Sequence, residues 1–238
     1  MYQKSYYIGS NDVDQFLDLK LSSLFKYMQD IATEHAEKLD IGKANTLDKG
    51  LYWVITRIEL DILKMPKYLE TITLKTYPGE DMKFIFPRYF RLEDEKGNVL
   101  VRGSSTWMVL NKNNHRPSLN PFNGKSLPPE HLEDELPLPR KCLSDTYTLI
   151  EERKVRYSDI DLNGHLNNTK YIDYIIDIHD SSFYKENQIS HFLINYEKEL
   201  MDNDVLSLSS NYQKDEYIRG EVNNALAFEV NIQYRKRL

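Results

Sequence analysis

The chain has 238 residues, 40% of them hydrophobic, and a formal net charge of −6 at pH 7. This length and composition suffice for one large or two small folded domains. The acidic balance argues against a nucleic-acid partner, which needs a basic surface to neutralise phosphates. The opening "MYQKSYYIGSND" has no apolar core typical of a signal peptide, and no stretch approaches the roughly 20 apolar residues of a membrane span. Cys142 is the only cysteine, so no intrachain disulfide is possible. We therefore expect a cytoplasmic protein without membrane insertion.

The first half predicts one amphipathic helix followed by strands. Apolar or aromatic side chains recur there at spacings of three or four, at Leu24, Met28, Ile31, His35 and Leu39. Gly42 is typical of a helix C-terminus. The segments "LYWVITRIEL", "TITLKT" and "VLVRGSSTWMVL" then have strand character, with a hairpin turn at "EKGN".

A proline-rich segment follows. Six of the nine prolines fall between Pro117 and Pro139, where neither helical nor strand periodicity is found. This pattern predicts a linker.

The second half repeats the order of the first, which indicates an internal duplication. A helix with Tyr171, Tyr174, Ile175 and Ile178 on one face is expected to begin at Asn167 or Asn168 as its N-cap. The strands "HFLINYEKEL", "VLSLSS" and "LAFEVNIQY" follow, with a hairpin turn at "VNNA". We predict an α+β fold in which each half has a long helix wrapped by an antiparallel sheet, and the halves pair side by side because pairing covers an exposed sheet edge. The predicted boundaries are 1–112, a linker at 113–145, and 146–238.

The stretch "DIDLNGHLNN", residues 159–168, concentrates acids, amides and an imidazole. If the segment is extended, Asp161, Asn163 and His165 project to the same side. The helix that follows would add N-terminal amides able to hold an oxyanion. These groups together predict a reaction centre.

Two other interpretations fit part of this stretch. "DIDLNG" matches the start of a calcium loop, but position twelve is Lys170 where that loop needs Glu. An ordinary turn with a surface His would also explain the composition. The corresponding first-half segment "NDVDQFLDLKL" keeps the acids without Asn-x-His, which favours a single active site on a duplicated scaffold.

Glu199, in "NYEKEL", is the expected chemical partner of the cluster. Partial burial on a strand would suit its carboxyl to proton transfer near neutral pH. A water-facing edge charge is the competing interpretation, and the first-half counterpart Glu59 shows that a Glu is tolerated at this place without catalysis.

These residues resemble the acyl-acyl carrier protein (acyl-ACP) thioesterase family, which has a double hotdog fold. The resemblance covers nearly the whole chain and is carried by "YSDIDLNGHLNNTKYIDY", "NYEKELMDNDVLSLSS", "YMQDIATEHAEKLDI" and "GLYWVITRIELDI". It implies two tandem hotdog domains, the first for acyl-chain recognition and the second catalytic. It places the family's functional residues on Asp161, Asn163, His165 and Glu199. Many plant members carry Cys after that Glu, whereas this chain has Leu200, so a thiolate mechanism is not expected.

The resemblance implies hydrolysis of acyl-ACP by general-base activation of water, with no cofactor and no metal. Glu199 and His165 would activate the water, Asn163 and helix amides would polarise the carbonyl, and Asp161 would orient them. Candidates for the acyl-binding tunnel are Met28, Ile31, Trp53 and Ile55, for which core packing is the alternative role. The partner would be an acyl carrier protein bearing a phosphopantetheine-linked chain, docked on a local basic surface. Candidates for that surface are Lys154, Arg156, Arg235, Lys236 and Arg237.

Other functions remain open at this stage. One is a hotdog thioesterase for acyl- or aroyl-coenzyme A. Another is a non-catalytic acyl-binding hotdog protein, although no added DNA-binding segment is visible. A dehydratase fits less well, because Asn163 with Glu199 matches the hydrolase pattern. The sequence is compatible with a monomer or a homodimer.

Overall fold

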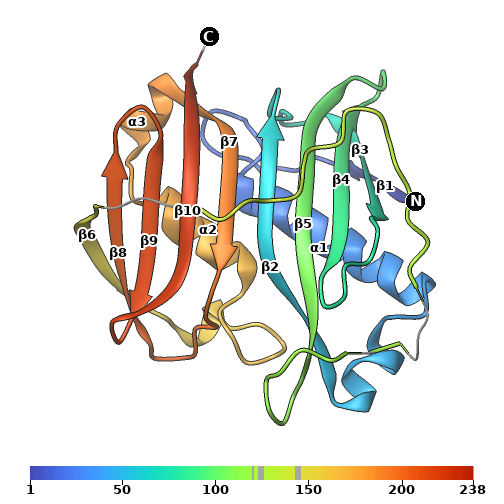
Figure 1. Ribbon diagram of the computed structural model, residues 1–238. Helices are drawn as coiled ribbons and strands as arrows, with labels where there is room; N and C mark the ends of the chain where they lie inside the picture. Colours follow the sequence, from blue (N-terminus) through green and yellow to red (C-terminus); the bar gives the residue numbers. More distant parts are fainter. Residues whose placement is uncertain (120, 123–125, 143–145, 238) are drawn as a thin grey trace. The chain divides into compact units, whose positions relative to one another are not determined.

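The computed structural model describes residues 1–119, 121–122, 126–142 and 146–237 (Figure 1). Two compact units are formed, one by residues 1–19 and 26–139 and the other by 20–25 and 140–238. Parts of the predicted linker, including its end at residue 145, lie outside the described residues. None of the described helices combines the length and the apolar character needed to cross a membrane.

The first unit is an antiparallel sheet with one long helix, as predicted. The sheet order is β1-β3-β4-β5-β2. Its strands are β1 (Tyr2–Tyr7), β2 (Leu51–Ile62), β3 (Thr71–Pro78), β4 (Phe86–Asp94) and β5 (Val99–Asn111). The helix is α1 (Leu21–Lys38), and the short 3-10 turns are η1 (Lys43–Asn45) and η2 (Leu47–Lys49). Strand β1 was not predicted, although its exposure alternates along the strand.

The helix packs closely on the sheet where β5 has a glycine. Met28 and Ile31 of α1 are buried, with Ile31 fully enclosed. A Cβ added at Gly103 would lie 2.9 Å from Cδ2 of Leu60 and 3.6 Å from Cε of Met28. The missing side chain therefore lets α1 approach β2 and β5.

A β-bulge in β2 decides which of its side chains face this core. The register between β2 and β5 shifts between Ile55 and Arg57. Because one extra residue is inserted there, Trp53 and Ile55 lie on the same sheet face as Ile58 and Leu60 despite their odd numbers. Periodicity alone could not have predicted this.

The proline-rich segment lies against the first unit over its described residues. Ser104 Oγ donates to the Pro137 carbonyl at 2.6 Å, and Arg91 Nη1 donates to the Glu133 carbonyl at 3.0 Å. Leu127 is only 2% exposed and packs with Ile41, Phe86 and Val109. The segment thus contributes side chains to the core of this unit.

The second unit repeats the strand order of the first. The order of its strands is β6-β8-β9-β10-β7. In both units the first strand along the chain pairs with the third, and the second strand along the chain stands last in this order. Its strands are β6 (Thr148–Lys154), β7 (Asn187–Tyr196), β8 (Val205–Tyr212), β9 (Glu216–Val222) and β10 (Ala225–Lys236). The predicted "VNNA" hairpin is confirmed, with φ of +52° and +61° at Asn223 and Asn224. The shared topology confirms the α+β fold of two similar halves.

The helix of the second unit is shorter than predicted. α2 (Asn168–Ile176) begins at the predicted N-cap Asn167 and buries Tyr171, Tyr174 and Ile175. Ile178 lies beyond its end, so the expectation of one long helix was wrong for this half. Asp180 accepts hydrogen bonds from the amides of Ser182 and Phe183 and starts a separate short helix, α3 (Ser181–Glu186). A carboxylate that caps a new helix competes with continuation of the old one.

Candidate functional site

The segment from Asp161 to His165 is a tight turn, and the expected extended conformation was wrong. Asp161 Oδ1 accepts hydrogen bonds from the amides of Asn163 at 2.8 Å and His165 at 3.3 Å. The Asp161 amide donates to the His165 carbonyl at 2.8 Å, and Gly164 has a φ of +87°. A short acidic side chain readily bonds amides two to four residues ahead, and glycine tolerates the left-handed backbone. The aspartate thus organises the turn that presents the imidazole.

His165 and Glu199 are brought together in the second unit. Their Nε2 and Oε2 atoms are 3.3 Å apart, and their side chains are 20% and 36% exposed. Glu199 lies after the end of β7 at Tyr196, in a loop, although it was expected on a strand. The Leu166 amide donates to the Leu200 carbonyl at 2.7 Å. This backbone bond fixes the two chain segments side by side and so places the imidazole beside the carboxyl.

Asn163 and its neighbour Leu162 occupy the exposed tip of the turn. Leu162 is 85% exposed. Among the residues that the structure describes, the Asn163 side chain makes no hydrogen bond to His165 or Glu199. The structure therefore pairs two of the four candidate side chains directly, uses Asp161 to shape the backbone, and leaves Asn163 facing outward.

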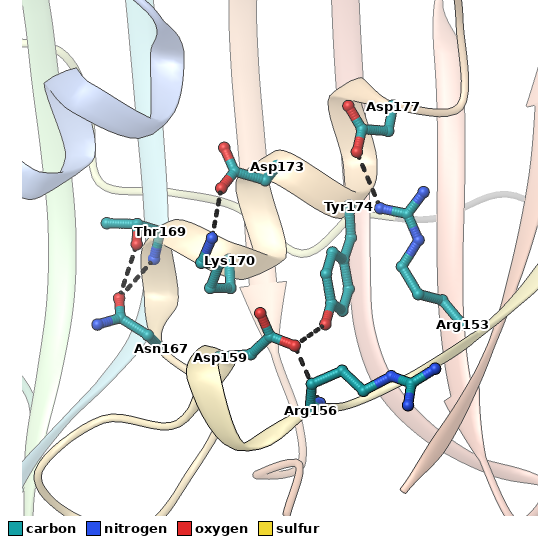
Figure 2. Close-up of polar contacts among 9 residues, drawn as sticks. All are labelled: Arg153, Arg156, Asp159, Asn167, Thr169, Lys170, Asp173, Tyr174 and Asp177. Atoms are coloured by element: carbon teal, nitrogen blue, oxygen red, sulfur yellow. Dashed lines mark hydrogen bonds and ion pairs between the residues drawn. The ribbon is translucent and has the colours of Figure 1, made fainter. Parts of the chain in front are cut away.

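The N-terminus of α2 is capped by its own neighbour (Figure 2). Asn167 Oδ1 accepts from both the amide and the hydroxyl of Thr169 at 2.9 Å, and the Asn167 carbonyl accepts from the Lys170 amide. The cap occupies two of the first-turn amides. Among the described residues the Asn168 amide has no hydrogen-bond acceptor.

A buried carboxylate that the sequence reasoning missed holds the turn to the helix. Asp159 is 9% exposed, and its Oδ2 accepts from the Tyr174 hydroxyl at 2.6 Å and the Arg156 amide at 2.9 Å (Figure 2). The Asp159 carbonyl accepts from the Asn167 amide at 2.8 Å. Burial, followed by the bond to Asp159, raises the pKa of Tyr174 above its ordinary value, so this hydroxyl remains a donor. The acid of "SDID" was visible in the sequence, but its tyrosine partner fifteen residues later was not.

Family models match both parts of the chain. Residues 1–120 match the model described as the acyl-ACP thioesterase N-terminal domain, and residues 144–236 match the corresponding C-terminal domain. The chain belongs to the acyl-ACP thioesterase family. The resemblance found in the sequence is thereby confirmed.

Named relatives and solved structures agree with this membership. The chain is 25% identical to the chloroplastic dodecanoyl-acyl-carrier-protein hydrolase of Cinnamomum camphora, over 88% of this chain and 59% of that protein. It is 23% identical to the chloroplastic palmitoyl-acyl carrier protein thioesterase of Gossypium hirsutum, over 87% of this chain and 54% of that protein. The chain thus spans somewhat more than half the length of these plant proteins.

Among solved structures, an acyl-ACP thioesterase from Bacteroides thetaiotaomicron matches with a TM-score of 0.87 at 22% identity, covering 98% of this chain and 97% of that one. The 12:0-ACP thioesterase from Umbellularia californica matches with a TM-score of 0.86 at 20% identity, covering 99% and 97%. At these identities the structural matches establish the double hotdog fold.

Three of the four residues predicted to bind an acyl chain in this family member are core residues of the first unit. Met28, Ile31 and Ile55 are buried. Trp53 is partly exposed, donates from Nε1 to the Ile41 carbonyl at 3.0 Å, and packs edge-on against Phe86. Their burial fits core packing, and an acyl-binding role stays a prediction.

Cys142 is unsuited to nucleophilic catalysis here. The residue is 2% exposed, and burial, then the charge of Glu229, raises the pKa of its thiol to about 12. A thiol with that pKa holds almost no thiolate at neutral pH. Within the described residues, no three His, Cys, Asp or Glu side chains are grouped as a metal would require.

Proposed function

We propose that the chain hydrolyses the thioester of acyl-acyl carrier protein and releases a free fatty acid. The observation that carries the proposal is the His165–Glu199 pair, 3.3 Å apart, in a chain of the acyl-ACP thioesterase family. The plant relatives are named for hydrolysis of acyl-ACP, which supports the same substrate class. An imidazole and a carboxylate in contact, partly exposed and next to a helix N-terminus, are the groups that general-base hydrolysis of an acyl compound needs.

In this mechanism Glu199 takes a proton from the attacking water. Its Oε2 lies 3.3 Å from His165 Nε2, which fixes the orientation of the carboxylate, and its Oε1 would accept the proton of the water. The Asn168 amide donates to the carbonyl oxygen as negative charge develops, and the outward-facing Asn163 side chain would have to turn toward the same oxygen when substrate binds. The leaving thiolate requires little protonation, so a strong general acid is unnecessary. Asp161 acts on the reaction through the backbone of the turn.

The first test replaces the carboxylate of Glu199 by an amide of the same shape. Glu199→Gln should lower the release of free thiol from acyl-ACP by about 10²–10⁴-fold, which is the contribution typical of a positioned base. Glu197→Gln is the matched control, since Glu197 is exposed and only two residues away. Near wild-type turnover by Glu199→Gln would remove this residue from the mechanism. Assaying the same acyl group on coenzyme A distinguishes a coenzyme A thioesterase, and tight acyl binding without turnover would indicate a non-catalytic binding protein.

A second pair of variants separates the charge of Asp161 from its role in the turn. Asp161→Asn keeps an oxygen that can accept from the amides of Asn163 and His165, whereas Asp161→Ala removes it. We expect the Asn variant to retain most activity and the Ala variant to lose most of it. Equal losses in both variants would show that the charge itself takes part in the reaction.

The carrier protein is proposed to dock beside the turn. Lys154 and Arg156 are exposed there, together with Tyr157 at 88% exposure and Leu162 at 85%. Of the other basic candidates, Lys236 is paired with Glu186, and Arg237 Nε donates to the Tyr184 carbonyl, while Arg235 makes other contacts. Lys154→Glu should therefore raise KM for acyl-ACP more than Lys236→Glu does, with little change in kcat. Indifference of both KM values to ionic strength would refute this docking surface.

The remaining parts of the proposal concern acyl recognition, location and assembly. We infer that the first unit recognises the acyl chain and the second catalyses, with a cytoplasmic location and either a monomer or a homodimer. Cell fractionation and light scattering test the last two directly. Trp53→Ala with an unchanged profile over acyl-chain length would count against Trp53 as a recognition residue.

A further inference from the structure

One arginine of the first unit is buried and has no acidic partner in the part of the chain that the structure describes. Arg88, on β4, is 7% exposed. Its Nη1 donates to His35 Nδ1 and to Thr76 Oγ1, both at 3.1 Å. No carboxylate among the described residues forms an ion pair or hydrogen bond with it. Burial of a guanidinium without a counter-charge is unfavourable, so this arrangement calls for an explanation.

Both neighbours of Nη1 are neutral. Burial, then the charges of Arg88 and other cationic groups, lowers the pKa of His35 to about 4. The imidazole is therefore uncharged at neutral pH, and its Nδ1 accepts the hydrogen bond. The Thr76 hydroxyl accepts from Arg88 and donates onward to the Tyr89 carbonyl at 3.0 Å. Burial alone accounts for the lowering of the pKa of Arg88 to about 10, which still leaves it charged.

The other edge of the guanidinium makes no hydrogen bond to any described residue. Nε and Nη2 carry parallel N–H bonds, the fork that binds a carboxylate in a bidentate manner. These two atoms of Arg88 are not fully enclosed. They differ in this from Nε of Arg102 and Nε of Arg219, which are fully enclosed and have no hydrogen-bond partner in the described part of the chain. The small residual exposure of Arg88 therefore reaches the fork, and a ligand can approach it.

Apolar side chains flank the fork on its own strand, and a second cation lies nearby. Burial, then the charge of Arg88, lowers the pKa of the Met1 ammonium, which is ion-paired with Glu130. Phe86 and Phe90 flank Arg88 on the same face of β4 and are 7% and 5% exposed. Met28 of α1 lies at the same sheet face, close to Gly103, which pairs with Phe90. A small hydrated anion would gain little from such walls, whereas an alkyl tail would be buried favourably.

We propose that Arg88 anchors a binding position in the first unit for the carboxylate of an aliphatic acid, whose tail packs among the buried apolar side chains of that unit. This inference goes beyond thioester hydrolysis, which is assigned to residues of the second unit, and holds whether or not the chain hydrolyses acyl-ACP. Two sources provide the same chemistry, namely a free fatty acid and an acyl group that bears a second carboxylate at its far end.

The test measures binding without turnover. The two tryptophans, Trp53 and Trp107, lie in the first unit, and Trp107 Nε1 donates to Ser105 Oγ, which donates to the Arg88 carbonyl. Intrinsic fluorescence can therefore follow titrations with decanoate, 1-decanol and monomethyl decanedioate. Wild type should bind decanoate or the half-ester at least roughly tenfold more tightly than the alcohol, because a hydrogen-bonded charge pair is lost with the alcohol. Tighter binding of decanoate identifies a free acid as the ligand, and tighter binding of the half-ester identifies a distal carboxylate.

Variants assign the preference to the fork. Arg88→Gln should remove the difference in binding affinity between acid and alcohol. Arg88→Lys keeps the charge without the fork and should reduce this difference. Arg91→Gln is the control and should keep the difference in affinity, because Arg91, the residue directly after Phe90, is already paired with Glu93. If Arg88→Gln does not fold, the affinities of the wild type and of Arg88→Lys for acid and alcohol still test the proposal. Equal affinity of wild type for acid and alcohol, or an unchanged difference in the Arg88 variants, would overturn the proposal.

Discussion

The hydroxyl of Tyr174 offers the clearest test of how the candidate site is held. Tyr174→Phe removes the hydrogen bond to Asp159 and keeps the aromatic ring. The Arg153 guanidinium lies 4.8 Å from the centroid of that ring, an interaction that phenylalanine can also make. The substitution therefore isolates the hydroxyl from its packing and from its cation–π contact.

The expected cost follows from the geometry of this bond. The O···O distance is 2.6 Å, the acceptor is a carboxylate, and the pair is buried, which places it among the stronger hydrogen bonds. Loss of such a bond should lower the free energy of unfolding by about 1.5–3 kcal/mol. For a chain of this size that corresponds to a decrease in Tm of roughly 3–12 °C. Because the Asp159 carbonyl also binds the Asn167 amide, the turn that carries His165 should lose rigidity and kcat should fall.

Urea unfolding of the single and double variants provides the assay. In a cycle with Asp159→Ala, which removes the acceptor, the coupling energy should reach at least about 1 kcal/mol, since the residues are in direct contact. Tyr157→Phe is the matched control, because Tyr157 is 88% exposed and should change stability by less than about 0.5 kcal/mol. A coupling energy near zero, or a cost equal to that of the control, would refute the view that this bond fixes the turn to α2.

Two further predictions concern the cores. His35 has a folded-state pKa of about 4 against an ordinary value of 6.5, so the unfolded chain binds more protons between these values. The free energy of unfolding should be highest above pH 6.5 and fall by on the order of 3 kcal/mol as the pH drops to 4. His35→Gln should flatten this part of the stability profile. Parallel profiles of wild type and variant would show that His35 is not the titrating group. A Cβ at Gly220 would lie 2.2 Å from Cε1 of the fully buried Phe228 ring. Gly220→Ala should thus lower the free energy of unfolding by roughly 1–3 kcal/mol, as measured by chemical denaturation. Adding Phe228→Leu should restore part of this stability, and no recovery would show that the clash is not the cause.

The repeated elements of the fold could be predicted because they depend on local periodicity. The 3.6-residue spacing from Leu24 to Leu39 and the alternation of "TITLKT" correspond to α1 and β3. The capping preference of Asn167 likewise depends on its immediate neighbours. The length of α2 was misjudged because Asp180 favours a new helix start, a competition that apolar spacing does not reveal.

The sequence by itself determined the double α+β architecture, the family and the set of acidic, amide and imidazole groups in residues 159–168. Each of these follows from the spacing and identity of residues close together in the chain. Only the tertiary structure decided that Asp161 binds the backbone of a turn, that Glu199 reaches His165 from a loop, and that Asp159 finds Tyr174. Among the described residues it also left the fork of Arg88 without an acidic partner. The physical reason is that a hydrogen bond or an uncompensated charge depends on distances between residues remote in sequence, and chain folding alone sets those distances.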